Sequence, residues 1–522
     1  MRTSLLFVLA CSGLSCAAVT PPPGIWLQGE AWLGAPLPTP RHATIHLHEG
    51  VLRVLDAPPA GAQVRRVDRI TAAFVDAHAH PIGLGQQLDT LDLRELPSYG
   101  RVLASVAERA SQDAADWLIG HGWDQNRWPD APPNGWPLAT DLDRVTGDRP
   151  ALLRRVDGHA IWVNAAALRA SGITAQTPDP AGGRIIRDAL GAPTGVLIDA
   201  AARLVSTPAP SVDQVARWLR TAQDELLRVG LAGVHDMGVD DTTLAAYRAL
   251  NAAQHLKIHV YAYLTPDSDA ARALLLEGPH HEGRLHVVGV KAIADGALGS
   301  RGAHLLEPYA DASDTRGLQI TDTHTLTTLA TRCLRVRAQL AVHAIGDAAA
   351  RSALDAFEAA RAAVPEARDV PLRLEHAQVI SPQDLSRLAP LNVVASVQPT
   401  HATSDHAWAV TRLGPERVPD SYAWRRLLDA GARMVLGSDV PVESPDPALG
   451  LLAATQRIDG SGAPTGGWRP EQALREPEAI AGFSFWAGEV VGEVPGRCIG
   501  ADGCGAEVTV WTTEGAEVLG LR

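Results

Sequence analysis

The chain has 522 residues, 46% of them hydrophobic and 20% charged, so it is long enough to bury a large globular core. Its formal net charge of −13 and the lack of any basic run argue against nucleic acid as a partner. After the first twenty residues no apolar stretch approaches the 18 uninterrupted residues that a membrane-spanning helix needs, so we expect no such helix.

Residues 1–20, MRTSLLFVLACSGLSCAAVT, have the layout of a secretory signal peptide: one arginine, a short apolar run and then small residues. VLAC, which ends at Cys11, and GLSC, which ends at Cys16, each partly resemble the lipid-attachment motif of bacterial lipoproteins. We therefore expect an exported protein of the bacterial periplasm or cell envelope. A soluble form and a form anchored by lipid at Cys16 or Cys11 both stay open, and the anchor would be its one contact with a membrane.

Three cysteines lie beyond this segment. Cys333 stands alone in a helical pattern and is expected to be a small buried hydrophobic residue. Cys498 and Cys504 flank a glycine-rich turn, CIGADGC, and could form a disulfide in an oxidising compartment.

The two chain ends predict a small β domain. HATIHLHEGVLRVLDAP alternates and turns as hairpin strands do, and the tail EVTVWTTEGAEVLGLR is again typical of strands. We predict a β-sandwich built from residues 21–69 and 476–522. His46 and His48 in TIHLH are interpreted as ordinary solvent-facing strand residues, because no ligand-type residue ends a neighbouring predicted strand.

Residues 70–475 alternate short apolar strands with helical segments, a pattern that predicts parallel strands joined by helical crossovers. The predicted strands are ITAAFVDAHAH, LAGVHDMG, KIHVYAYL, HVVGVKAIADG, AQLAVHAIGD, PLRLEHAQV, VVASVQPT and RMVLGSDVPV. Eight such units favour the α/β class and a closed (β/α)8 TIM barrel. Residues 90–225, after the first strand, are too many for a loop and predict an inserted subdomain. Its HGWDQNRWPDAPPNGWP fits either a pocket lining or a packed structural insertion.

Ligand-type residues end five of the eight predicted strands. These residues are His78 with His80, Lys291, His343, His376 and Asp439. The carboxyl ends of barrel strands converge on one mouth, and strand alternation points both histidines of an HxH pair to one face. Taken alone, His343 could be an ordinary buried histidine, and Asp439 could cap the turn that follows it. Together, these six residues at the ends of five strands predict a metal site.

Lys291 stands out in composition as well. Lys257 and Lys291 are the two lysines among the 46 lysine and arginine residues, and all the others are arginines. Lys291 either acts at the predicted metal site or is a lysine of the barrel mouth that reaches toward solvent or a phosphate group.

Six motifs resemble those of the metal-dependent amidohydrolase superfamily, in the branch that includes N-substituted formamide deformylase. They are FVDAHAH, VDGHAIWVNAAAL, GVKAIADGALGSR, VHAIGDAA, RLEHAQ and LGSDVPVESPDP, which follow the order of the family from about residue 70 to 450. The resemblance implies a (β/α)8 barrel, a small β-sandwich made from both termini, and one or two divalent metal ions, commonly zinc. It also implies a long insertion after the first barrel strand.

The resemblance assigns a role to each ligand-type residue. His78 and His80 would bind the more buried ion, His343 and His376 the second ion, and Asp439 would touch the first ion and shuttle protons. Lys291 falls where many members hold a carboxylated lysine that bridges both ions. A carbamate offers two oxygens and a negative charge, whereas an ammonium group has no lone pair, and arginine stays protonated.

Three further residues match family motifs. His159, Asp295 and Arg301 are expected to orient the substrate or to have a structural role. The implied reaction is hydrolysis of a non-peptide carbon–nitrogen bond, such as an N-acyl or N-formyl amide of a small molecule, by metal-activated hydroxide. A cyclic amidase or deaminase of the same superfamily, and a catalytically silent surface binding protein, are the alternatives. A homo-oligomer is also left open.

Overall fold

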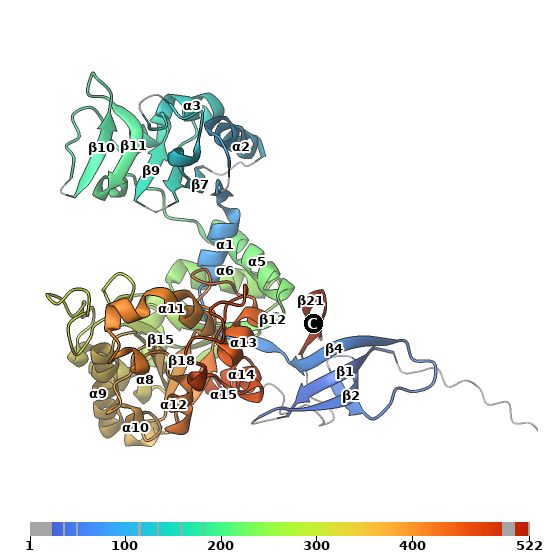
Figure 1. Cartoon of the computed structure of the whole chain (residues 1–522). Coiled ribbons are helices and arrows are strands. Elements are labelled where there is room, and N and C mark those ends of the chain that lie inside the picture. The colour runs from blue at the N-terminus through green and yellow to red at the C-terminus, as the bar shows by residue number, and fades with distance from the viewer. Residues whose placement is uncertain are drawn as a thin grey trace, which may run out of the picture. The chain divides into compact units, whose positions relative to one another are not determined.

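The computed structural model describes residues 23–34, 37–48, 51–94, 96–112, 116–132, 135–156, 159–180, 182–492 and 507–519. The chain divides into two compact units, one formed by Met1–Pro81 with Gln223–Arg522 and the other by Ile82–Ala222 (Figure 1). The predicted signal peptide, with Cys11 and Cys16, and the pair Cys498 and Cys504 lie outside the described residues.

The first unit contains a parallel barrel whose strands lie in the order β19–β18–β17–β16–β15–β13–β12–β5. Their bounds are β5 Phe74–Ala79, β12 Leu231–Val239, β13 His259–Leu264, β15 Leu285–Ile293, β16 Gln339–Ala344, β17 Leu372–His376, β18 Val393–Val397 and β19 Arg433–Leu436. β14 (His280–Glu282) pairs with β15 as an antiparallel addition. The backbone N–H of Asp439 donates to His78 O at 2.7 Å, which links the two end strands. The predicted α/β class and TIM barrel are confirmed.

Helices cover the outside of the barrel, which is why its strands are apolar on both faces. The helices are α6 Asp241–Ala252, α7 Asp269–Glu277, α8 Thr323–Arg335, α9 Asp347–Ala363, α10 Leu385–Leu388, α11 Pro399–Leu413, α12 Trp424–Asp429 and α13 Pro447–Gln456, while α5 Val212–Arg228 contains the boundary between the two units. In α8 the buried residues recur every three or four positions, and Cys333 is fully buried among them, as predicted. None of the helices in the described ranges is long and apolar enough to cross a membrane.

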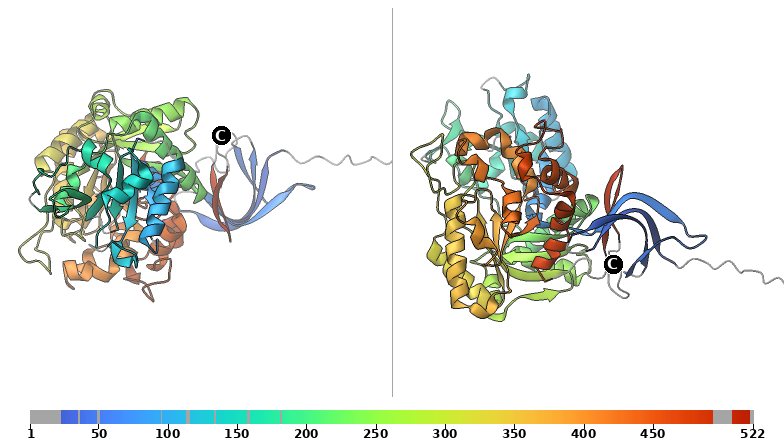
Figure 2. Two further views of the ribbon diagram at one scale, coloured as in Figure 1. Left: turned by 90° about the horizontal axis from the view of Figure 1, so that it is seen from above. Right: turned by 60° about the horizontal axis from the view of Figure 1, so that its bottom comes forward.

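Both chain ends build one six-stranded sheet in the order β21–β20–β4–β1–β2–β3, whose C-terminal strands lie beside the N-terminal ones (Figure 2). The strands are β1 Ile25–Leu33, β2 Thr39–His48, β3 Val51–Leu55, β4 Val64–Ala72, β20 Val508–Thr512 and β21 Gly515–Leu519. The segment from residue 476 differs from the expected strands, because it begins with helices α14 (Glu476–Gly482) and α15 (Phe485–Val490). Ala487 and Val490 of α15 pack in one core cluster with barrel residues Val75 and Val435.

His46 in β2 is buried, so the expectation that it faces solvent is wrong. Its ring stacks on Trp26 of β1 with a centroid distance of 4.1 Å, and its Nε2 lies 3.0 Å from Pro23 O. The register pairs His46 directly with Trp26, which brings the two rings onto the same face of the sheet. The contact gives His46 the structural role of a packed strand residue.

The second unit is built around a six-stranded sheet in the order β10–β11–β9–β8–β7–β6. Its elements are α1 Pro81–Asp89, β6 Leu91–Asp92, α2 Tyr99–Gln112, β7 Leu118–Trp123, α3 Ala139–Thr146, β8 Ala151–Arg155, β9 Ala160–Val163, α4 Ala165–Ala170, β10 Gly183–Arg187 and β11 Pro193–Asp199. Trp123, Trp128 and Trp162 pack together in its hydrophobic core. Of the two interpretations of the tryptophan-rich segment, the packed structural one therefore holds for Trp123 and Trp128.

Candidate active site

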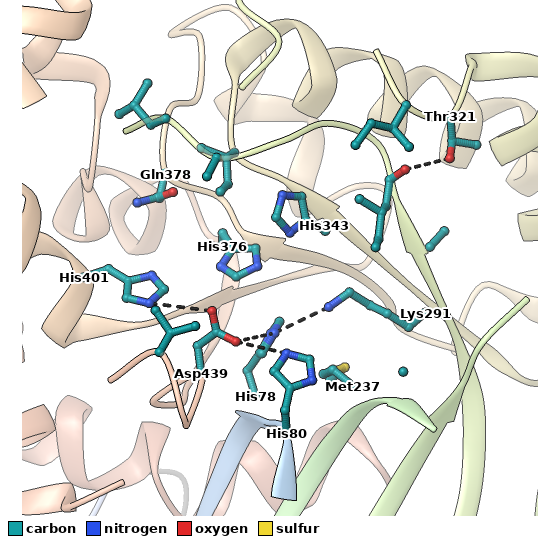
Figure 3. Close-up of a pocket in the computed structure, with 18 of the residues that line it drawn as sticks. His78, His80, Met237, Lys291, Thr321, His343, His376, Gln378, His401 and Asp439 are labelled. Carbon is teal, nitrogen blue, oxygen red and sulfur yellow. Dashed lines mark hydrogen bonds and ion pairs between the residues drawn. The ribbon is translucent and has the colours of Figure 1, made fainter. Parts of the chain in front are cut away.

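One cavity of about 910 Å³ opens at the carboxyl ends of the barrel strands (Figure 3). All six residues that the sequence predicted as ligands line it: His78, His80, Lys291, His343, His376 and Asp439. They come from β5 and the residue after it, from β15, β16 and β17, and from the loop after β19, so strands far apart in sequence converge on one mouth, as the barrel geometry requires.

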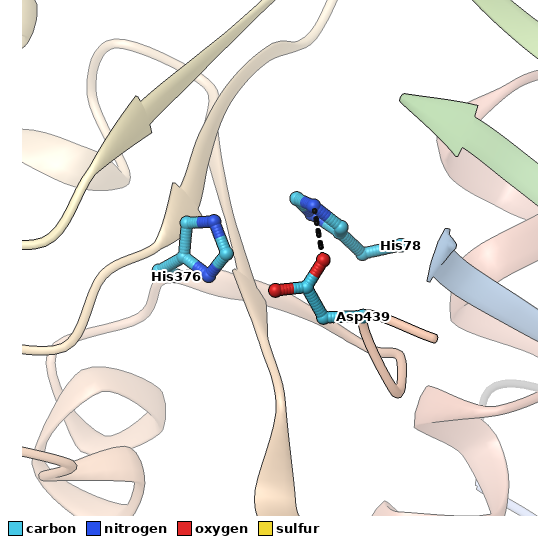
Figure 4. Close-up of side chains that lie close together, drawn as sticks. All are labelled: His78, His376 and Asp439. Atoms are coloured by element: carbon cyan, nitrogen blue, oxygen red, sulfur yellow. Dashed lines mark ion pairs between the residues drawn. The ribbon is translucent and has the colours of Figure 1, made fainter. Parts of the chain in front are cut away.

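His78, His376 and Asp439 form the tightest cluster, with ligand atoms that all lie within 4.8 Å of one another (Figure 4). Asp439 Oδ1 lies 3.4 Å from His78 Nε2 and 3.1 Å from His80 Nε2. His376 and Asp439 have φ angles of 68° and 63°, in the left-handed region that non-glycine residues rarely adopt. Such strained backbone is typical of functional sites, where the surrounding structure holds it in place.

Lys291 and His343 complete this part of the cavity. Lys291 Nζ lies 3.4 Å from His78 Nε2 and, in the described part of the chain, forms an ion pair with no carboxylate. The ring centroid of His343 lies 4.4 Å from that of His376, and His343 Nε2 lies 3.5 Å from Asp295 Oδ1. The cavity thus brings together imidazole nitrogens, an amine and a carboxylate.

Burial determines the charge of these groups. It lowers the pKa of His78 to about 4 and that of His343 to about 3, in both cases with help from nearby Lys291. Burial also lowers the pKa of the Lys291 amine. Burial alone would raise the pKa of Asp439, but the nearby histidines, His78 foremost, bring it below its usual range. At neutral pH the cluster therefore presents neutral imidazoles and an ionised carboxylate, which are donors that suit a divalent cation.

The sequence reading missed His401, which lies in the first turn of α11, just after β18. Its Nε2 is 3.7 Å from Asp439 Oδ2, and this buried nitrogen has no hydrogen-bond partner among the residues that the structure describes. His401 lines the same cavity as the predicted residues. A signal for it existed, because it follows the seventh predicted strand as the other residues follow theirs.

Two buried residues that the sequence did not predict, Glu375 and Gln398, contact the Nδ1 nitrogens of His78 and His376. His78 Nδ1 lies 2.7 Å from Glu375 Oε2, and His376 Nδ1 lies 2.8 Å from Gln398 Oε1. Partners of this kind fix the ring orientation of metal-binding histidines. In each ring they leave Nε2 as the nitrogen available to the cavity.

Asp76 and Gly437 lie where β5 contacts the loop after β19, next to the cluster. The Asp76 carboxylate accepts hydrogen bonds from Ser438 N at 2.9 Å, Ser438 Oγ at 2.5 Å and His78 N at 3.1 Å. A Cβ atom at Gly437 would lie 2.4 Å from His78 N, so only glycine allows the two end strands to approach this closely. These contacts tie β5 to the loop after β19.

The three residues predicted to orient substrate lie in different surroundings. Asp295 is fully buried and accepts hydrogen bonds from the backbone N–H groups of His304, Ile345 and Gly346. Arg301 pairs with Asp311 at 2.9 Å. Neither Asp295 nor Arg301 is among the described residues that line the cavity.

His159, the third of these residues, belongs to the second unit. It lies just before β9, and its Nδ1 is 2.8 Å from Asp199 Oδ1. A role for His159, Asp295 or Arg301 in orienting substrate stays a prediction.

Apolar side chains form much of the remaining wall. They include Met237, Ile293, Leu298, Ile320, Trp408 and Val442. The acidic residues Asp267, Asp405 and Glu443 also line the cavity, whereas Lys291 is the single lysine or arginine among the described lining residues. Apart from Lys291 and the histidines, the charged groups of this largely apolar wall are therefore acidic.

Comparison with known proteins places the whole barrel in one family. A family model described as "Amidohydrolase family" matches residues 69–495. The candidate amidohydrolase YtcJ of Bacillus subtilis is 35% identical over 449 residues, which cover 84% of this chain and 82% of YtcJ. N-substituted formamide deformylase of Arthrobacter pascens is 28% identical over 435 residues, which cover 80% of this chain and 78% of that enzyme.

A solved structure agrees with this placement. An uncharacterized metal-dependent hydrolase from Pyrococcus furiosus has 26% sequence identity and a TM-score of 0.74, with 93% of this chain and 98% of that chain covered. The family match, residues 69–495, includes the barrel and the cavity residues from His78 to Asp439. The chain therefore belongs to the amidohydrolase family, and it is a hydrolase of carbon–nitrogen bonds other than peptide bonds.

Proposed function

We propose that this protein hydrolyses an N-acyl or N-formyl amide of a small molecule with the help of one or two divalent metal ions. The observation that carries the proposal is the cluster of His78, His376 and Asp439, whose ligand atoms lie within 4.8 Å of one another. The cluster lies in the cavity at the carboxyl ends of the strands, where barrel enzymes bind their substrates.

The donor atoms of the cavity fit a divalent ion, and we propose zinc, because imidazole nitrogens and carboxylate oxygens are its usual ligands. Among the described residues, the buried Nε2 atoms of His343 and His401 have no hydrogen-bond partner, although each lies near a carboxylate oxygen, at 3.5 Å from Asp295 Oδ1 and 3.7 Å from Asp439 Oδ2. The proposed ligands are His78, His80 and Asp439 for one ion, and His343 and His376 for a second. When bound, the metal supplies a Lewis acid that polarises a carbonyl group and lowers the pKa of water.

We further propose that Lys291 carries a carboxylate group and bridges the two ions. Its Nζ lies 3.4 Å from His78 Nε2, a position where an ammonium group would repel a metal ion. The free amine is the form that adds carbon dioxide: a nitrogen–carbon bond forms and one proton leaves to solvent. The resulting carbamate provides two oxygens and a negative charge at the same place.

Asp439 is the proposed proton shuttle. When water attacks the carbonyl carbon of the amide, the Asp439 carboxylate accepts its proton and then delivers it to the leaving nitrogen. The carbon–nitrogen bond breaks, and a carboxylic acid and an amine result. His80 Nε2 lies 3.1 Å from this carboxylate and His401 Nε2 lies 3.7 Å from it.

The cavity wall supports a neutral amide with an apolar substituent on nitrogen or on the acyl group. Trp408, Leu298 and Ile320 offer apolar contacts, and the acidic Asp405 and Glu443 would repel a substrate carboxylate. The name of the relative from Arthrobacter pascens, a deformylase of N-substituted formamides, supports the same class.

A panel of substrates tests this proposal against its alternatives. Amine release from N-formyl and N-acyl amines is expected from the purified protein and not from the Asp439→Asn variant. Ring opening of cyclic amides or ammonia release from amino-heterocycles, without amine release, would instead identify a cyclic amidase or a deaminase. A wild-type protein that is inert toward every class would contradict the proposed function.

We also propose that the protein is exported. The proposal rests on the signal-like segment of residues 1–20, with Cys11 and Cys16 as the candidate lipid-attachment sites. The mass of the mature protein from the periplasmic and membrane fractions tests it. A mature chain that begins at Cys11 or Cys16 and carries lipid indicates an anchor, and an uncleaved cytoplasmic chain contradicts export.

A further inference from the structure

A buried ion pair, Arg373 and Glu375, lies inside the barrel next to His78. Both side chains are fully buried and come from β17, where positions two apart point to the same face of the strand. Arg373 Nε donates to Glu375 Oε1 at 2.6 Å, and Glu375 Oε2 lies 2.7 Å from His78 Nδ1. Two charges are costly to bury, so their place beside a candidate metal ligand points to a role beyond packing.

Each group that forms a hydrogen bond with Arg373 must act as the acceptor, because a guanidinium group can only donate. Besides Glu375 it donates to Ala77 O at 2.7 Å, Ser396 Oγ at 3.0 Å and Tyr263 Oη at 3.1 Å. It also lies 2.6 Å from His235 Nδ1, which must therefore be an unprotonated acceptor. Both carboxylate oxygens of Glu375 therefore act as acceptors toward Arg373.

The ionised carboxylate in turn determines which nitrogen of His78 carries the proton. Glu375 Oε2 can only accept, so His78 Nδ1 must donate, and the lone pair of the neutral ring then lies on Nε2. His78 Nε2 is the atom that faces the cavity, 3.4 Å from Asp439 Oδ1 and 3.4 Å from Lys291 Nζ. That nitrogen is the one the proposed metal site requires.

We propose that Arg373 and Glu375 are positioning residues that hold His78 as the Nδ1–H tautomer and so present its Nε2 lone pair to the metal. Arg373 donates to both carboxylate oxygens of Glu375, from Nε to Oε1 at 2.6 Å and from Nη2 to Oε2 at 3.2 Å, and so holds the carboxylate against His78 Nδ1. The inference rests on the proposed metal-dependent function.

Metal affinity separates this role from a purely structural one. We expect Glu375→Gln to weaken zinc binding by the apo protein about 10–100-fold, as loss of such a partner typically does, in competition with a chelator. Tyr263→Phe is the matched control, because it removes a buried hydroxyl bonded to Arg373 and Gln339 but leaves the contact between Glu375 and His78. Its zinc affinity should equal that of the wild type.

The tautomer itself is measured by ¹⁵N NMR of the histidine-labelled apo protein, with His78→Asn to assign the signal. The inference predicts Nδ1–H in the wild type and a larger share of Nε2–H in Arg373→Gln. It is overturned by an Nε2–H tautomer in the wild type, or by wild-type zinc affinity in a folded Glu375→Gln. If Glu375→Gln does not fold, the wild-type tautomer decides. A wild type that binds no metal contradicts the proposed function, while the tautomer still tests this inference.

Discussion

His78 and Asp439 are joined twice, once through the backbone and once through their side chains. The Asp439 N–H donates to His78 O at 2.7 Å, and Asp439 Oδ1 lies 3.4 Å from His78 Nε2. The seam that links the first and last strands of the barrel therefore runs through the candidate metal cluster. Changes that disturb this seam should affect the site and the fold together.

Gly437→Ala tests this coupling. The added Cβ would lie 2.4 Å from His78 N and 2.7 Å from Asp76 Oδ1, so the seam must open. We expect a loss of about 1–3 kcal/mol in the free energy of unfolding, as for other overpacked sites, together with weaker metal binding. Chemical denaturation and zinc titration measure the two effects.

The matched control is Gly100→Ala in α2, where the added Cβ meets one atom, Asp130 Oδ2, at an ordinary 3.4 Å. Alanine in a helix should stabilise this position by up to about 1 kcal/mol. Unchanged stability and unchanged metal affinity in Gly437→Ala would show that the seam tolerates a side chain.

Asp439→Asn should abolish most of the hydrolysis. The substitution keeps the shape of the side chain but removes the carboxylate that accepts the proton, so we expect kcat to fall about 10²–10⁴-fold. Steady-state kinetics on the best substrate of the panel, with metal content measured in parallel, give the comparison. Full activity in the variant at normal metal content would exclude Asp439 as the proton shuttle.

Lys291→Ala should lose both activity and metal, because the bridging group disappears. A short carboxylate at high concentration should restore part of each, since it can occupy the place of the carbamate. Lys291→Arg is the control: it keeps a long cationic side chain but cannot be carboxylated, so neither activity nor metal is expected. A Lys291→Ala protein with wild-type activity and metal content would show that Lys291 is not a ligand.

Glu478 gives a pH dependence away from the site. It accepts from Arg475 Nε at 2.9 Å and pairs with Arg425; although burial raises its pKa, these arginines lower it to about 2. The pKa of Glu478 is lower in the folded protein than the value of about 4.3 in the unfolded chain. Ionised Glu478 therefore stabilises the fold fully above about pH 4.3, and this contribution is lost as pH falls toward 2. We expect a loss of about 1–2 kcal/mol in that window, since exposed Arg475 is partly screened.

Unfolding free energies measured from pH 5 to pH 2 check this expectation. The acid-induced loss should be smaller in Glu478→Gln, which has no group to titrate at that position. Identical pH profiles in the two proteins would remove Glu478 as the cause.

Periodicity and residue type were enough to predict much of the barrel from the sequence. Each of the eight apolar runs overlaps one barrel strand, and the ligand-type residues at their ends reach one cavity because parallel strands share a direction. Cys333 was predicted as buried because a lone cysteine in a helical pattern behaves as a small hydrophobic residue. These features follow from the local sequence pattern and from the rule that the strands of a parallel barrel all run in the same direction.

Residues whose role depends on tertiary contacts were not predictable in the same way. Glu375 and Gln398 act through histidines on other strands, and no local pattern pairs them. The charged residues of RLEH, inside an otherwise apolar parallel strand, were a usable signal, because such strands are buried on both faces. The packing of His46 against Trp26 likewise depends on strand register.

The central claim is that hydrolysis depends on a metal ion bound by the histidine and aspartate cluster. Activity toward the best amide of the panel, measured after chelation and again during zinc titration of the stripped protein, tests it most directly. The account predicts an inactive stripped protein whose hydrolysis returns in proportion to bound metal, and little metal binding by a variant in which His78 and His376 are both replaced by alanine. Undiminished hydrolysis by the metal-free protein, or a protein that stays inert when zinc is bound, would contradict it.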